Sequence, residues 1–504
     1  MSSDAVGSER ISRVVGYKIT KGDFSNRTPN LPQRIAILGE ANTANQAGIT
    51  ADVGVEINSA KEAGELFGYG SPIYNIMRIL RPVNSDGVGG IPTIVFPQAE
   101  GAAVAQVTDV TVTGTATGNA THTMTVAGRD GVDAGSYELN IVTGDTPTLI
   151  AAKISDALNG VLGCPFSGSP ALGVMTATSK WKGLTSAGLS ISIDNNGNGV
   201  GVTYAIVSTT PGSVTPSVAT ALTNFGNDWN TIVVNSYGLV GTTMTELETF
   251  NGIPDPVAPT GRYTGIVMKP FIALSGSVSD EDTAITDARL DDVTIAVCPA
   301  PLSAGLAMEA AANMALIHAR IAQDTPHRDV EGQTYADMPT PAVIGTMAEY
   351  NNRDAYVKKG NSTVDLFGGK YRIQDFVTTY HPVGETPPQF RYCRNLNLDW
   401  NVRFGYYLLE QINVVDHVIA NDEDVVTVGN VIKPKQWVAI MNTYASDLAK
   451  RALIADPAFM QDSIDVGLSG VNPDRLETFF RYKRTGVVRI ASTTAEAGFN
   501  FGEV

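Results

Sequence analysis

The hydrophobic positions between residues 34 and 98 alternate between buried-strand runs and helical patterns. RIAILGEAN (Arg34–Asn42) and IPTIVFPQ (Ile91–Gln98) are short apolar runs that predict strands. Between them, Ser59–Gly68 begins with a serine followed three residues later by a glutamate, the capping-box pattern of a helix start. A second helix is expected over Ser71–Asn84, with a proline near each end. This strand–helix–strand order predicts an α/β unit.

The pattern becomes β-rich between residues 101 and 222. Eight threonines between Val107 and Thr125 alternate with valine and glycine, which is typical of a half-buried strand. The other predicted elements are strands at Ser136–Val142 and Leu189–Ile193, a hairpin turn at Asn195–Gly201 and one helix at Thr146–Asn159. Charged residues are scarce here, so we expect a β-rich domain inserted into the α/β unit.

The rest of the chain returns to mixed patterns. Buried-strand runs and a long alanine-rich helix, Leu302–Gln323, continue the α/β unit to about residue 365. Helices at Leu396–Ile412 and Pro434–Ile454 dominate the last unit. The expected domains are an N-terminal arm and linker (1–30), a discontinuous α/β core (31–98 and 223–365), a β-rich inserted outer domain (99–222), a C-terminal domain (366–485) and a C-terminal arm (486–504). The predicted fold class is therefore multidomain, combining α/β and α+β parts.

Two segments near the chain ends have strand-like sequences but no local neighbour with which to pair. ISRVVGYKI (Ile11–Ile19) is followed by a loop rich in glycine, asparagine and proline, and GVVRIA (Gly486–Ala491) lies close to the other end. A strand on a loose arm has to find its sheet elsewhere, and another chain can supply it. We therefore predict intersubunit strand arms, with the candidate residues Ile11, Val14, Val15, Tyr17, Ile19, Val487, Val488, Arg489 and Ile490.

Composition limits the kinds of partner. The 504 residues carry 35 basic and 51 acidic side chains, a net charge of −16, which opposes attraction to nucleic acid or anionic membranes. The start of the chain lacks signal-peptide features, no stretch approaches the roughly 18 apolar residues of a membrane span, and the cysteines show no metal-binding spacing. We expect a protein made in the cytoplasm, without a nucleic-acid partner or membrane insertion, whose cysteines are buried small hydrophobes.

The sequence lacks the motifs of common catalytic and cofactor sites. It contains no G-x-S-x-G, no HExxH and no GxxxxGK[ST] phosphate loop. The glycines of residues 197–201 lie between two predicted strands with no helix after them, so we interpret them as a turn. His318 and His327 are spaced too widely for one helix face of metal ligands, and the acidic run Asp280–Asp292 lacks the calcium-loop pattern. We expect no catalytic residue, no metal and no cofactor.

One local charge asymmetry stands out near the C-terminal end. Residues 471–490 hold five basic side chains against two acidic ones. They form either a solvated strand edge or a basic patch that pairs with the acidic surface of a partner or a neighbouring copy. The candidate residues for such a charged interface are Arg475, Arg481, Lys483 and Arg484.

Four segments, in this order, resemble the Mu-like contractile tail sheath proteins, a phage tail sheath family. They are ELFGYGSPIYNIMRILRPVN (Glu65–Asn84), similar to the family's LFG-x-GS helix pair; Gly128–Asn159, similar to its inserted domain; FVTTYHPVGETPPQFRYCRNLNLDWNVRFGYY (Phe376–Tyr407), similar to the opening of its last domain; and VNPDRLETFFRYKRTG (Val471–Gly486), similar to its closing segment. The resemblance covers most of the chain.

The resemblance implies a subtilisin-like α/β core without a catalytic triad, an insertion that faces outward and a C-terminal domain that faces a tail tube. It implies a structural role in a virion: many copies form stacked rings around a tail tube protein, bounded by baseplate and tail terminator proteins. Contraction of this helical assembly drives the tube through the host envelope for genome ejection and host entry. In such sheaths both terminal arms add a strand to the C-terminal domain of a neighbouring subunit. The expected location is the tail of a bacteriophage virion, after synthesis in the host bacterium.

Two other functions stay open on the residues alone. An enzyme of the α/β hydrolase type would need a nucleophile and a base that the motifs do not supply. An adhesion module would use the Thr- and Gly-rich region 101–222 to bind a host ligand, by itself or as part of a sheath. The sequence does not distinguish a phage tail from a related bacterial injection particle.

Overall fold

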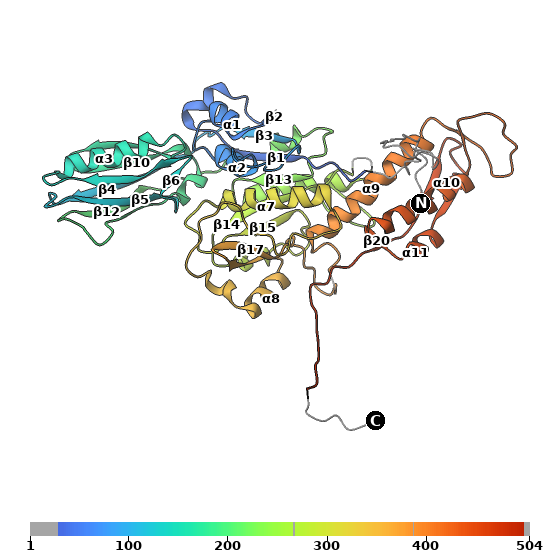
Figure 1. Cartoon of the computed structure of the whole chain (residues 1–504). Helices are drawn as coiled ribbons and strands as arrows, with labels where there is room; N and C mark the ends of the chain where they lie inside the picture. The colour runs from blue at the N-terminus through green and yellow to red at the C-terminus, as the bar shows by residue number, and fades with distance from the viewer. Residues whose placement is uncertain (1–28, 266–267, 387, 498–504) are drawn as a thin grey trace, which may run out of the picture. The chain divides into compact units, whose positions relative to one another are not determined.

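The computed structural model describes residues 29–265, 268–386 and 388–497. Contacts between residues divide the chain into two compact units, and each is described separately (Figure 1). The larger unit comprises Leu31–Asn401 with Arg484–Val504, and the smaller comprises Met1–Asn30 with Val402–Lys483. The chain is thus a mixed α/β protein with several sheets and more than one unit, which confirms the general fold class.

A six-stranded sheet forms the centre of the α/β core, in the order β15-β14-β13-β1-β3-β2 (Figure 1). Its members are β1 (Ile35–Glu40), β2 (Val55–Glu56), β3 (Thr93–Gln98), β13 (Ile232–Asn235), β14 (Ile272–Ser277) and β15 (Ile295–Pro299). All neighbours pair in parallel except the short edge strand β2. The five parallel strands are buried along their whole length, which explains why their sequences are continuous apolar runs rather than alternating patterns.

Helices cover both faces of this sheet. Ala36 and Leu38 of β1 belong to one apolar core cluster with residues of α4 (Ala219–Thr223) and α5 (Gly241–Asn251). Because side chains alternate along a strand, Ile35 and Ile37 point to the other face. There α2 (Pro72–Leu80) and α7 (Ala307–Asp324) contact each other and the central strands. The shorter α6 (Thr283–Thr286) precedes β15.

The local signals read from the sequence place most of these elements correctly. α1 (Ala60–Phe67) begins where the Ser59 side chain accepts a hydrogen bond from the backbone of Glu62, at 3.1 Å, and ends before Gly68, whose φ is +92°. α7 begins later than predicted, because Leu302 has a left-handed φ of 57° that does not fit a helix. Short 3₁₀ turns complete this unit at Thr43–Gly48, Leu184–Gly188, Gly261–Tyr263 and Gly345–Ala348.

The region between β3 and β13 is a β-rich insertion built from two antiparallel sheets. Its strands are β4 (Ala105–Thr113), β5 (Ala120–Val126), β6 (Gly131–Val132), β7 (Gly135–Ser136), β8 (Glu138–Ile141), β9 (Phe166–Ala171), β10 (Val174–Lys182), β11 (Ile191–Asp194) and β12 (Thr203–Thr210). The sheets have the orders β12-β4-β10-β9 and β11-β5-β8, with β6 and β7 forming a separate small pair, and α3 (Pro147–Gly160) packs on β9 and β10.

The hairpin predicted at Asn195–Gly201 is wrong. β11 pairs with β5 and β12 pairs with β4, so the glycine-rich segment carries the chain from one sheet to the other. Periodicity shows that two strands follow one another, but it does not show which strands they pair with.

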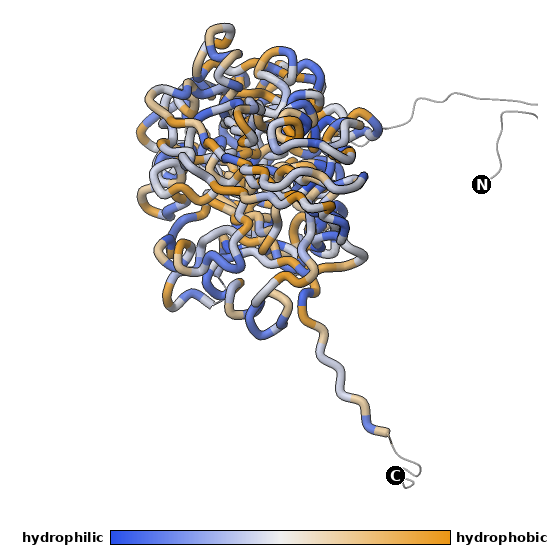
Figure 2. Tube along the Cα trace, turned by 90° about the vertical axis from the view of Figure 1, so that its left-hand side faces the viewer, coloured by the Kyte–Doolittle hydropathy of each residue, from blue (hydrophilic) through white to orange (hydrophobic). Residues whose placement is uncertain are grey.

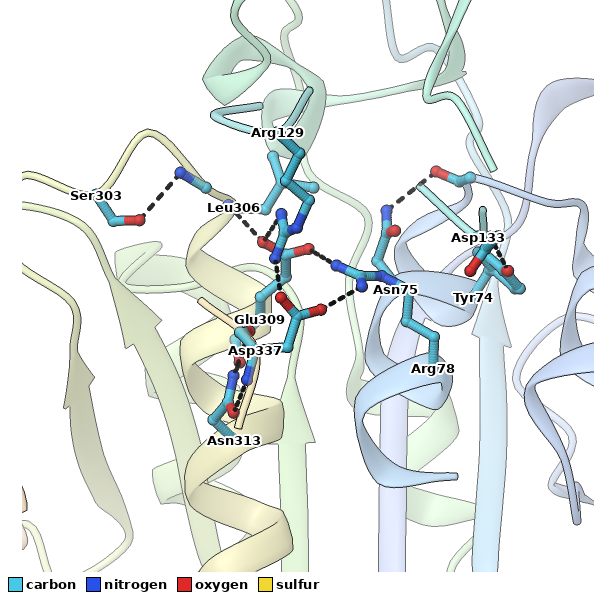
Figure 3. Close-up of polar contacts among 12 residues, drawn as sticks. Tyr74, Asn75, Arg78, Arg129, Asp133, Ser303, Leu306, Glu309, Asn313 and Asp337 are labelled. Atoms are coloured by element: carbon cyan, nitrogen blue, oxygen red, sulfur yellow. Dashed lines mark hydrogen bonds and ion pairs between the residues drawn. The ribbon is translucent and has the colours of Figure 1, made fainter. Parts of the chain in front are cut away.

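Four charged side chains, three of them largely buried, join the insertion to the core (Figure 3). Arg129, in the turn after β5, donates to Glu309 on α7 at 2.9 Å and to Asp337 at 3.2 Å. Arg78 on α2 donates to the other oxygen of Glu309 at 2.6 Å and also to Asp337. Each carboxylate therefore bridges both guanidinium groups, and the Glu309 side chain is only 1% exposed. We call these four residues the charge quartet.

The charge quartet is continuous with the start of α7. Glu309 also accepts the backbone N–H of Leu306 at 3.0 Å, which satisfies a donor at the helix start. The side-chain amide of Asn313 donates to the backbone carbonyls of Glu309 and Asp337, at 2.8 and 3.0 Å. These bonds hold Glu309 and Asp337 in place beside the arginines from α2 and from the insertion (Figure 3).

The smaller unit is helical, with short strands. α9 (Cys393–Asn413) includes residues of both units, because the division between them falls at residue 402. The hairpin of β16 (Thr363–Phe367) and β17 (Lys370–Asp375), preceded by α8 (Tyr350–Lys358), belongs to the larger unit. The remaining elements are α10 (Pro434–Lys450), α11 (Pro457–Asp462), β18 (Val418–Ile419), β19 (Val431–Ile432), β20 (Ile454–Ala455), β21 (Asp465–Leu468), β22 (Leu476–Phe479) and β23 (Lys483–Arg484).

Removing the central carboxylate of the charge quartet is expected to destabilise the fold strongly. Glu309→Ala leaves two buried guanidinium groups with one carboxylate, and breaking a buried ion pair typically costs about 3–5 kcal/mol. Urea unfolding measures the loss. The control is Glu65→Ala, which removes an exposed partner of Lys61 and should change the free energy of unfolding by less than about 1 kcal/mol. Equal effects of the two variants would contradict a stabilising role for the quartet.

Candidate subunit-contact site

The C-terminal segment is fastened to the larger unit at its start. Arg484 makes a bidentate ion pair with Asp399, with N–O distances of 2.8 and 2.5 Å, and donates to the backbone carbonyl of Gln389 at 3.0 Å. A planar guanidinium matches a carboxylate in two parallel bonds, so this contact fixes direction as well as position.

A second arginine holds the next residue. Arg394 on α9 donates to both the backbone carbonyl and the hydroxyl of Thr485, each at 2.7 Å, and to the carbonyl of His327 at 2.7 Å. The segment therefore leaves the core at a defined point on α9.

Arg489 is placed against its own subunit by three groups. Its guanidinium forms ion pairs with Asp329 and Glu331 and lies over the ring of Tyr392, 3.7 Å from the ring centroid. The Asp329 side chain is 4% exposed and that of Arg489 17%, so the contact is largely removed from water. In such surroundings charge-assisted bonds and cation–π contacts are stronger than on an open surface.

The apolar residues of this segment are exposed. Val488 is 83% exposed, Ile490 82% and Val487 38%. The strand predicted at Gly486–Ala491 has no pairing partner in the described parts of the chain, and residues 490–497 are all exposed. Figures 1 and 2 show the segment as an extended trace that leads away from the core of its unit. In Figure 2 the beginning of this trace is coloured as hydrophobic.

The N-terminal candidates Ile11, Val14, Val15, Tyr17 and Ile19 lie outside the described residues. Their role as a strand arm stays a prediction.

The smaller unit contains a two-stranded antiparallel sheet formed by β21 and β22. Intermediate and exposed residues alternate along both strands. The hairpin is attached to α10, because the indole of the buried Trp437 donates to the Thr478 hydroxyl at 3.1 Å. A sheet of two strands has an edge on each side with unpaired N–H and C=O groups, and these edges can accept a further strand.

The four basic candidates do not form one unpaired patch. Arg475 lies 3.0 Å from Glu477 and Lys483 lies 2.6 Å from Asp456, while Arg484 is taken up by Asp399. Arg481 lies over the ring of Phe479, 5.4 Å from its centroid. Of the four, Arg484 therefore acts inside its own subunit. The other three side chains are exposed on the smaller unit: Arg475, Arg481 and Lys483.

His318 and the three cysteines are buried, and His327 is partly buried. His318 is buried against Phe376, and burial lowers its pKa to about 4, so it is neutral at physiological pH. His327 is partly buried, and its pKa is lowered by burial and by nearby arginines. Cys164, Cys298 and Cys393 are free and buried, as predicted. Within the described residues, no three His, Cys, Asp or Glu side chains are grouped to hold a metal.

A small cavity of about 150 Å³ lies at the carboxyl edge of the parallel sheet, where α/β enzymes bind ligands. It is lined by Thr185, Ser236, Tyr237 and the start of α7. None of the described residues that line it is a histidine.

One ionisable residue that the sequence analysis missed lies beside this cavity. Glu40, at the end of β1, is 0% exposed and accepts a hydrogen bond from Thr185 at 2.8 Å. Burial raises the pKa of its carboxyl to about 8, and the neighbouring Glu100 adds to the shift. The available signal was a glutamate directly after a run of strand-forming apolar residues. Glu100 in turn accepts from Thr43 at 2.7 Å and from the backbone of Lys182 at 3.0 Å, which makes a second polar link between core and insertion.

Comparisons with known proteins add a distant structural likeness. No family model matches the chain, and no curated protein matches it. The crystal structure of a sheath tail protein from Desulfitobacterium hafniense is similar over 93% of this chain and 100% of that chain, with 10% identity and a TM-score of 0.44. In the described parts, no helix combines the length and apolar character needed to cross a membrane.

Glu40 is expected to make stability fall as the pH rises from about 4.5 to about 8. Its carboxyl is neutral in the folded protein up to a pKa of about 8, but the unfolded chain ionises near the ordinary value of 4.5. Between these values the unfolded state has lost a proton that the folded state keeps, so each rise in pH favours unfolding. Above about pH 8 both states are ionised and this contribution is lost.

The measurement is the free energy of unfolding in urea at pH 5 and pH 8. Glu40→Gln should reduce the difference between the two values, because the substituted side chain does not titrate. Glu65→Gln, on the exposed side of α1, is the control and should keep the wild-type difference. An unchanged difference in Glu40→Gln would contradict the assignment.

Proposed function

We propose that this chain is a structural subunit of a contractile tail sheath, in which each copy hands a terminal strand to a neighbouring copy. The observation that carries the proposal is the C-terminal segment: its start is fastened by Arg484 and Thr485, while Val488 and Ile490 are more than four-fifths exposed with no strand partner in the described parts of the chain. Exposed β-branched residues on an extended segment are suited to joining a sheet edge of another chain.

The acceptor in this proposal is the β21–β22 hairpin of the smaller unit. Each chain then carries both a donor segment and an acceptor edge, which are different surfaces. Contacts between two different surfaces of identical subunits are head-to-tail, and they generate closed rings or open helical arrays rather than closed dimers. Such a geometry matches the stacked rings of a sheath.

Strand exchange also suits an assembly that changes shape. Main-chain hydrogen bonds hold the donated strand, so the pairing between two copies can persist while the subunits move as rigid bodies. Weak contacts repeated over many copies give a strong assembly, since each added subunit binds through several neighbours at once. In the finer proposal, a Mu-like sheath with a subtilisin-like core surrounds a tail tube protein between baseplate and tail terminator proteins, and its contraction drives the tube through the host envelope.

The proposed role is structural rather than enzymatic, because the features that support the proposal are the C-terminal segment and the open edges of the β21–β22 hairpin. No observation favours adhesion through the insertion over its use as an outer sheath domain. The proposed location is a virion tail.

Removing the donor segment should abolish polymers without unfolding the subunit. A chain that ends after Arg489 loses only residues that are exposed where they are described, so its circular dichroism and urea unfolding should match those of the full chain. By electron microscopy the full chain should form long hollow tubes and the shortened chain should not. Tubes of the shortened chain, or a full chain that stays monomeric at high concentration with a tube protein present, would contradict the proposal.

Disulfide trapping should show that the strand passes between copies. The native cysteines are buried, so single exposed cysteines introduced at Ser492 and at Gly467 of β21 are the reactive ones. Mixing Ser492→Cys protein with Gly467→Cys protein should give a mixed dimer after mild oxidation. Val257→Cys, at a residue 90% exposed and outside both segments, replaces Gly467→Cys as the control and should give much less of that product. Equal yields from both mixtures would argue against this acceptor.

A further inference from the structure

Arg489 is the last residue of the C-terminal segment whose side chain is held by the larger unit. Arg484, Thr485 and Arg489 are held there with the exposed residues 486–488 between them, and from Ile490 to Ala497 every residue is exposed. The sequence pattern GVVRIA crosses this point without any break, so the division is visible only in the structure.

Three arginine contacts make the held part rigid. Arg484 is paired with Asp399, Thr485 is held by Arg394, and Arg489 is paired with Asp329 and Glu331. The held part is thus fastened at both ends, and the short stretch between them contains Val487 and Val488. An extended stretch with two fixed ends has little freedom to slide.

The Arg489 contact differs from an ordinary surface ion pair. Asp329 is 4% exposed, and the guanidinium is covered on one side by the Tyr392 ring at 3.7 Å. Exposed pairs contribute little because water and salt screen them, but a pair with one buried partner and an aromatic cover is screened much less. Tyr392 lies directly before α9, and Asp329 follows α7, so Arg489 connects the segment to two separate parts of the core.

We propose that Arg489 is a positioning residue that ends the part of the segment held by its own subunit, so that the strand handed to the next copy begins at Ile490. This inference rests on the proposed function and adds to it the register of the exchanged strand. Successive side chains of a strand face opposite sides, so a slip of one residue would turn its apolar side chains to the wrong face. A fixed residue directly before the donated strand prevents such a slip.

The same contact gives the segment a mechanical role. When neighbouring copies move, a pull on the donated strand meets the Arg489 contacts before it reaches Thr485 and Arg484. Without Arg489, the residues back to Gly486 would be drawn out and the linker between copies would lengthen. Arg489 therefore sets the linker length as well as the register.

The experiment uses spin labels on the full chain at Val488 and Ser492, introduced singly as cysteines beside three buried native ones. Both positions are exposed, so the labels should not disturb packing. In the monomer, the label at Val488 should be restricted and the label at Ser492 mobile. Arg489→Ala should make the Val488 label as mobile as the Ser492 label.

The matched control is Arg372→Ala in the same unit. Arg372 also pairs with a carboxylate, Asp365 at 2.6 Å, and also lies over an aromatic ring, that of Phe367 at 4.5 Å. It lies in the β16–β17 hairpin, so its removal should leave both labels unchanged. Arg489→Lys keeps the charge but not the planar stacking, and should restore part of the restriction.

The assembled state supplies the second measurement. On assembly the label at Ser492 should become immobilised and that at Val488 should change little, while Arg489→Ala should give fewer tubes and a broader spread of tube dimensions. A Val488 label that is already mobile in the wild type, or unaffected by Arg489→Ala, overturns the inference. These monomer measurements need no assembly, so a failure of the inference can be told apart from a failure of the full chain to form tubes, which would instead overturn the proposed function.

Discussion

The fold depends on the largely buried charge quartet that joins the long insertion to the core. β1 and β13 are neighbours in the sheet, yet a complete β-rich domain lies between β3 and β13 in the sequence. Arg129 and Arg78 approach Glu309 from the insertion and from α2, so a single carboxylate on α7 holds both. Removing one member would leave a buried charge unpaired, which is costly. The quartet therefore favours the one orientation of the insertion in which Arg129 reaches Glu309. The charges also have a directional effect that apolar contact lacks, because each guanidinium fits its carboxylates in one geometry.

The C-terminal segment repeats this use of arginine at the edge of the same unit. Arg394, Arg484 and Arg489 act on successive points of one extended stretch, and each finds a partner within its own subunit. The basic run that the sequence suggested as a patch for partners is therefore partly an internal fastening. What stays available is the set of exposed side chains of Val487, Val488 and Ile490 and the open edges of a two-stranded hairpin. The strong contacts are thus internal, and the proposed contacts between copies are individually weak backbone pairings.

The parts of the structure with local signals could be predicted. Three local patterns each predict the element in which they lie: the capping box at Ser59, the prolines around α2 and the continuous apolar runs of the parallel strands. Strand pairing could not be predicted: the segment Asn195–Gly201 has turn chemistry, but its two strands enter different sheets. The charge quartet and Glu40 were equally hidden, because partners up to 259 residues apart meet only after the fold forms. The strand-like character of the C-terminal segment was visible, whereas the role of Arg489 depends on Asp329, far away in sequence.

A subunit that exchanges strands needs a terminal segment whose first part is bound to its own subunit and whose last part is exposed. A segment free along its whole length would lose more conformational entropy on pairing and could pair in several registers, whereas a segment fastened throughout could not reach a neighbour. Holding the chain up to Arg489 shortens the part that has to be ordered and leaves the pairing residues accessible. Asp329, one of the partners of Arg489, is itself buried and lies near the buried Cys393 of α9, so the interior of the larger unit supports this contact. The part of the segment bound to its own subunit therefore ends at Arg489. The ion pair of Arg489 with the buried Asp329 can resist tension on the strand that begins at Ile490 and pairs with another copy.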